Sequence, residues 1–100
     1  MRLGGAVPAE IGQLTSLEWL DLYGDELTSV PAEIGQLASL TVLRLFDNQL
    51  TRLPAEIGQL TSLRGFWLFD NRLTSVPAEI EQLRAAGCYV HLDAGVTIDD

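Results

Sequence analysis

Val30 to Leu37 reads VPAEIGQL, and this stretch decides the fold. The same letters occur from Val7, recur from Leu53 with leucine in first place, and return from Val76 as VPAEIEQL. The period is therefore 23 residues, the strongest regularity in the chain. A fixed period of this length is typical of a solenoid, in which each unit buries its apolar side chains only by stacking on its neighbours.

The second half of each unit predicts a short strand. Leu20 and Leu22 lie two residues apart, and the same pair returns as Leu43 with Leu45 and as Phe66 with Leu68. A spacing of two places both side chains on one face of a strand. Val90 and Leu92 predict a fourth strand, one residue later than the 23-residue period would place it. The chain is thus expected to be one domain, 1–100, with units starting near 7, 30, 53 and 76 and a C-terminal cap at about 84–100.

The first half of each unit predicts a short helical segment. Pro31, Pro54 and Pro77 stand where a helical turn begins, and we expect them at the first helical position, where the missing N–H costs nothing. Glu33 and its equivalents then fall in the first turn, where the helix dipole favours a carboxylate.

The full pattern, P-x-E-I-G-x-L-x-x-L-x-x-L-x-L-x-x-N-x-L, resembles the leucine-rich-repeat family from Val7 to about Leu83. Its P-x-E-I-G-x-L segment is most similar to the intracellular, Ras-associated type of repeat. The resemblance implies an α/β horseshoe arc, with a parallel concave sheet of about four strands and short helical segments on the convex side. It also implies a protein-binding role, with a small GTPase or signalling protein as a possible partner that no residue here identifies.

Asn48 and Asn71 occupy the position that the family uses for an asparagine ladder. An amide both donates and accepts, so it can satisfy backbone groups of adjacent coils where sheet pairing ends. Asp25 holds this place in the first full unit, and because an ionised carboxylate only accepts, half of the ladder contact is expected to be lost there.

Composition narrows the classes of partner and compartment. The net charge is −8, with six arginines and no lysine, so nucleic acid and anionic membrane surfaces are disfavoured. No apolar run is long enough for a signal peptide or a membrane span. One cysteine, Cys88, excludes a disulfide-bonded cap, and the chain has no N-glycosylation sequon. These features predict a cytoplasmic protein.

The first unit is incomplete in the sequence. Val7 to Leu14 is a helical segment whose preceding strand would lie upstream, and only Met1 to Ala6 precede it. We expect no amphipathic segment over Ile11, Leu14, Leu17 and Leu20. Either the chain is a fragment of a longer array or a second copy covers this edge, which would make a homo-oligomer.

No catalytic, metal or cofactor site is predicted. His91 is the only histidine, and no hydroxyl or thiol stands beside a base in the sequence. Cys88, His91 and Asp93 have a ligand-like spacing, but alternation along a strand turns Cys88 inward and the other two outward. The chain is therefore expected not to be an enzyme.

The functional prediction rests on the outward-facing positions of the predicted strands. They hold six of the seven aromatic residues in three rows: Trp19, Val42, Gly65 and Tyr89; Asp21, Arg44, Trp67 and His91; Tyr23, Phe46, Phe69 and Asp93. The expected partner-binding residues are Trp19, Asp21, Tyr23, Val42, Arg44, Phe46, Trp67, Phe69, Tyr89 and His91.

Two interpretations of this face remain open. It binds a protein partner, with Arg44 reaching Asp21 on one side and stacking on Trp67 on the other, above an acidic rim at Asp47 and Asp70. Alternatively, Tyr23, Phe46 and Phe69 form a ladder that only stabilises the sheet. Binding is the stronger interpretation for the two tryptophans, because tryptophan is enriched at interface hot spots.

Overall fold

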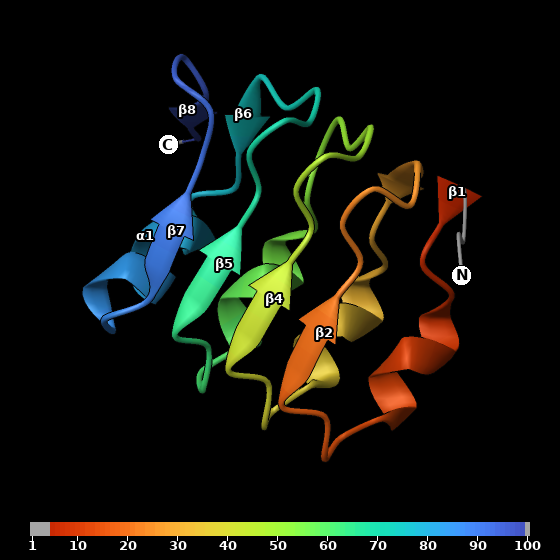
Figure 1. Cartoon of the computed structure of the whole chain (residues 1–100). Helices are drawn as coiled ribbons and strands as arrows, with labels where there is room; N and C mark the ends of the chain where they lie inside the picture. Colours follow the sequence, from red (N-terminus) through yellow and green to blue (C-terminus); the bar gives the residue numbers. More distant parts are fainter. Residues whose placement is uncertain (1–4, 100) are drawn as a thin grey trace.

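The computed structural model describes residues 5–99 as a stack of coils (Figure 1). Four parallel strands lie side by side on one face, and the helices lie behind them (Figure 1). These strands are β2 (Trp19–Asp21), β4 (Val42–Arg44), β5 (Gly65–Trp67) and β7 (Tyr89–His91). Three five-residue 3-10 helices, η1 (Ala9–Gln13), η2 (Ala32–Gln36) and η3 (Ala55–Gln59), precede one α-helix, α1 (Glu79–Ala85).

The register of the sheet is the one that the 23-residue period predicts. Leu20 pairs with Leu43, Leu43 with Phe66, and Phe66 with Val90. These side chains point toward the helices, and Leu43 and Phe66 are completely buried. The four-stranded parallel sheet with helices on its other side confirms the predicted α/β arc.

Two further pairs of strands lie on the turn side of the coils, and the repeat pattern does not predict them. β1 (Gly5–Ala6) pairs in parallel with β3 (Leu27–Ser29), and β6 (Ser75–Val76) pairs with β8 (Thr97–Ile98). Each contains a strand of only two residues, too short for a hydrophobic alternation to show.

The prolines were predicted at the first helical position, but they lie before the helices. Pro31 has φ −77° and ψ 159°, so it is extended and caps η2 from outside, and the helix begins at Ala32. Pro54 does the same for η3, while in the last unit Ala78 caps α1. An extended proline still costs no hydrogen bond here, because the N-cap N–H is not part of the helix ladder. Glu33 lies in the first turn, as expected.

A glycine in each 3-10 helix allows the next coil to pack closely. A Cβ placed on Gly35 would lie 2.6 Å from the Glu56 backbone oxygen, and one on Gly58 would lie 2.7 Å from the Cβ of Glu79. Both distances are shorter than side chains tolerate, so coil stacking requires glycine there. In the last unit Glu81 takes this place and is exposed, and the segment continues as an α-helix to Ala85.

The predicted asparagine ladder is present. The Asn48 side-chain oxygen accepts hydrogen bonds from the backbone N–H groups of Asp25 and Leu27, each at 3.0 Å. Its amide nitrogen donates to the carbonyl oxygens of Leu22 and Leu45, each at 3.0 Å. Asn71 likewise accepts from the N–H of Leu50 and donates to the carbonyl of Leu45. Asn48 is 7% exposed, so it satisfies backbone groups inside the stack.

The first coil leaves its apolar residues uncovered, as expected. Leu14 is 51% exposed, whereas Leu37, at the same position of the next unit, is 0% exposed. Ile11, Leu17 and Leu20 are half-buried. β2 is also an edge strand of the main sheet. This side of the molecule therefore presents the surface that every later coil buries against its predecessor.

Candidate functional site

The open face of the main sheet, here called the concave face, carries the side chains that point away from the helices. Its first row consists of Trp19, Val42, Gly65 and Tyr89, and its second of Asp21, Arg44, Trp67 and His91. Both rows agree with the predicted register. Trp19 is 58% and Tyr89 57% exposed, which is high for such large apolar groups. The structure thus brings the predicted residues of these two rows onto one surface.

An aromatic stack runs across the coils where the strands end. The rings of Tyr23 and Phe46 lie 5.0 Å apart with an interplanar angle of 10°, and those of Phe46 and Phe69 lie 4.8 Å apart at 7°. Such offset stacks contribute about 0.5–1.5 kcal/mol per pair beyond area burial. The stack therefore stabilises the sheet and at the same time forms one wall of the concave face.

Asp93 does not end this row, contrary to the prediction. Its carboxylate accepts the backbone N–H of Asp70 at 2.9 and 3.1 Å. In the preceding coil the Asp47 N–H donates to the Phe69 carbonyl, so Asp93 supplies with its side chain an acceptor that backbone supplies elsewhere. His91 takes the place beside Phe69 instead, at 4.6 Å between ring centroids.

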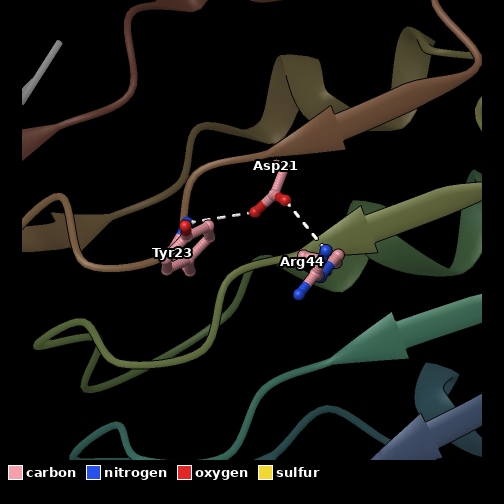
Figure 2. A network of polar contacts seen from close by, with 3 residues as sticks. All are labelled: Asp21, Tyr23 and Arg44. Atoms are coloured by element: carbon pink, nitrogen blue, oxygen red, sulfur yellow. Dashed lines mark hydrogen bonds and ion pairs between the residues drawn. The ribbon is translucent and has the colours of Figure 1, made fainter.

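Arg44 is held on the side of the first coil (Figure 2). Its guanidinium Nη1 lies 3.0 Å from the Asp21 carboxylate, and Asp21 also accepts the Tyr23 backbone N–H at 3.5 Å. The guanidinium carbon lies 5.1 Å from the Phe46 ring centroid and 5.7 Å from that of Tyr23. The ion pair with Asp21 was predicted, but the predicted stacking on Trp67 is wrong, because the carboxylate and these two rings draw Arg44 away from it.

Trp67 leans into the first row. A Cβ on Gly65 would lie 2.5 Å from two atoms of the six-membered ring of Trp67, so that ring fills the place a side chain at position 65 would occupy. The ring also lies 6.0 Å from that of Tyr89. Glycine two residues before tryptophan in a strand is the signal in the sequence for this arrangement.

A hollow of about 530 Å³ lies between the side chains of Arg44 and Trp67. It is lined by Trp19, Val42, Arg44, Phe46, Trp67, Phe69 and His91. All seven belong to the predicted binding residues, whereas Asp21, Tyr23 and Tyr89 lie beside the hollow. Its size falls within the range of known ligand pockets, and most of its walls are apolar.

Carboxylates line the turns next to the aromatic stack. Asp47 and Asp70 are exposed, with φ of 60° and 58°, and Gly24 has φ of 68° at the equivalent place. Aspartate tolerates this left-handed conformation better than most residues. The acidic rim that was predicted at Asp47 and Asp70 is therefore set on tight turns beside the concave face.

Cys88, just before β7, and His91, at the end of β7, lie on opposite faces of the main sheet. Cys88 is buried, and burial raises the pKa of its thiol, while His91 is exposed on the concave face. Within residues 5–99, no three His, Cys, Asp or Glu side chains are grouped so as to hold a metal ion. No helix in the same range is long and apolar enough to cross a membrane.

Comparison with known proteins places the chain in a family. The family model described as "Leucine-rich repeat region" matches residues 3–86. The structure is similar to a leucine-rich-repeat protein of Leptospira interrogans, with 43% identity, a TM-score of 0.74, and coverage of 86% of this chain and 22% of the other. It is also similar to a chain of the BIR3–SERK2 complex of Arabidopsis thaliana, with 28% identity, a TM-score of 0.74, and coverage of 99% and 53%.

The chain thus spans 22% and 53% of the length of these two solved proteins. No curated protein matches it. Members of this family are typically protein-binding modules without catalytic activity. With most of its residues covered by the family model, and with the coil geometry described above, the chain belongs to the leucine-rich-repeat family.

Proposed function

We propose that this chain binds a protein partner on its concave face and carries out no catalysis of its own. The observation that supports this most is the apolar hollow between Trp19 and Trp67, beside two further exposed aromatic side chains, Tyr23 and Tyr89. Monomers seldom expose large contiguous apolar surface without a partner for it. The plant relative was solved as a complex of two proteins, which agrees with binding as the role of the fold.

The negative charge beside the concave face indicates which kind of partner surface fits it. Asp47 and Asp70 lie beside the aromatic stack, and the whole chain carries a net charge of −8. A complementary surface presents apolar side chains to the hollow and basic side chains to the acidic rim, which also speeds association at low salt. We propose a cytoplasmic signalling or scaffold role, with a small GTPase as the first partner class to test because of the Ras-associated type of the repeats.

Replacing both tryptophans tests the proposal. We expect the Trp19→Ala, Trp67→Ala variant to bind its partner at least about tenfold more weakly, because truncating buried interface aromatics costs more than about 1 kcal/mol each. Affinity capture identifies the partner, with purified GTPases in both nucleotide states as the first panel, and calorimetry gives Kd. A Thr28→Ala, Thr51→Ala variant is the control, since both threonines are exposed outside the main sheet. Unchanged affinity in a folded double-tryptophan variant would reject the concave face.

Self-association is a second candidate, supported by the exposed first coil. Leu14 is 51% exposed, and Ile11, Leu17 and Leu20 of the same coil are only half-buried, while β2 is an edge strand of the main sheet. A second copy turned about a twofold axis would cover both edges at once, because such an interface uses the same surface twice.

Sedimentation velocity over a range of concentrations tests this second candidate. We expect a dimer at high concentration, and a shift to monomer in Leu14→Glu, because an unpaired carboxylate cannot be buried in an apolar interface without a large cost. Gln13→Glu adds the same charge on the same exposed coil and is expected to leave the dimer intact. A wild-type protein that remains monomeric at every concentration would exclude self-association.

A further inference from the structure

The hollow of the concave face exists because two side chains of the second row lean in opposite directions. Arg44 is drawn toward Asp21 and the ring of Phe46. Trp67 leans the other way, over Gly65, which is buried beneath it. Only glycine allows this position of the indole ring, since a Cβ would lie 2.5 Å from it and heavy atoms do not approach so closely. Gly65 thereby positions Trp67.

The chemistry of the hollow selects a neutral apolar group. Its floor and walls are formed mainly by Trp19, Val42, Trp67, Phe46 and Phe69. The charge of Arg44 is already paired with Asp21 at 3.0 Å, so a buried anion would have to compete with that carboxylate. A cation is disfavoured by the same guanidinium, although aromatic walls alone would attract one. A neutral side chain gains from area burial without either conflict.

We propose that the hollow is a socket for one bulky apolar side chain of a partner, and that Gly65 determines its shape by admitting the ring of Trp67. This inference rests on the proposed binding function and adds the chemical class of the anchor. The volume of about 530 Å³ holds an aromatic side chain together with part of its backbone. Any side chain at position 65 displaces the Trp67 ring into the socket.

The probe for the socket is N-acetyl-L-phenylalaninamide, with N-acetylglycinamide as the matched control lacking the side chain. The two indole N–H signals of the protein, assigned with Trp67→Phe, are followed by NMR during titration. We expect saturable shifts of both signals in the low millimolar range with the phenylalanine probe and none with the glycine probe. The absence of a saturable shift in the wild type would overturn the proposal.

Two variants test the role of Gly65. In Gly65→Ala we expect the unliganded Trp67 signal to move and probe affinity to fall at least fivefold, with buried core signals unchanged. Val42→Phe fills the socket from the strand next to Gly65 but leaves glycine at position 65, and an equal loss is expected there. Probe binding that is unchanged in either folded variant would overturn the proposal.

The outcomes separate this inference from the proposed function. If the double-tryptophan variant loses its partner but Gly65→Ala and Val42→Phe do not, the socket is wrong and the concave face remains the site. If the probe binds as expected but the affinity for the partner is unchanged in all of these variants, the proposed function is wrong instead.

Discussion

Asn48→Ala is expected to lower the free energy of unfolding by about 2–4 kcal/mol. The amide group of Asn48 makes hydrogen bonds with backbone groups of Asp25, Leu27, Leu22 and Leu45. Alanine leaves these groups without their partner in a place that water does not reach, and each buried unsatisfied group costs about 1–3 kcal/mol. Single domains are stable by only about 5–15 kcal/mol, so the loss is a large fraction of the total.

Urea unfolding followed by far-UV circular dichroism measures this effect, and an unchanged slope shows that the unfolded state is comparable. Gln49→Ala is the matched control, because Gln49 is the next residue and is exposed; its effect is expected to stay within about 0.5 kcal/mol. Equal losses for the two variants would mean that the ladder does not hold the coils together.

Leu37→Ala is expected to cost about 2–5 kcal/mol, whereas Leu14→Ala is expected to cost less than about 1 kcal/mol. Both residues end the same VPAEIGQL stretch, but Leu37 is 0% exposed and Leu14 is 51% exposed. Truncation of a buried leucine loses the transfer free energy of its side chain and also leaves a cavity. Truncation of a half-exposed leucine loses only part of that transfer free energy and leaves no cavity.

The comparison also detects anything that covers the first coil in solution. Unfolding is measured at low and at high protein concentration, because a dimer interface stabilises the folded state by mass action. A Leu14→Ala cost that approaches that of Leu37→Ala at low concentration would contradict the exposed position of Leu14. The same rise at high concentration alone would support self-association.

The sheet and its rows follow from periodicity. Two periods, 23 along the chain and two along each strand, place Trp19 beside Val42 and Arg44 beside Trp67 without further information. The buried leucines and the asparagine ladder follow in the same way, since stacking equal units brings equal positions together.

What periodicity does not determine is the direction in which a side chain leans within its row. The guanidinium of Arg44 packs on the rings of Tyr23 and Phe46 and not on Trp67, because it forms an ion pair with the carboxylate of Asp21. Trp67 followed the space left by Gly65. In the last coil the ring of His91 lies beside that of Phe69, and the carboxylate of Asp93 accepts the Asp70 N–H. These are competitions between neighbours, which spacing alone does not reveal.

Glu81 makes the two ends of the stack unequal in their ability to pack against a further coil. In η2 and η3 the equivalent residue is glycine, and its lack of a side chain is what lets another coil come close. A coil of this type cannot add beyond α1, since the side chain of Glu81 would stand in its path. Within residues 5–99, the exposed surface around Leu14 is a side on which such a coil can pack. Copies of the chain that meet there can close into a pair, but they cannot continue head to tail into a fibre.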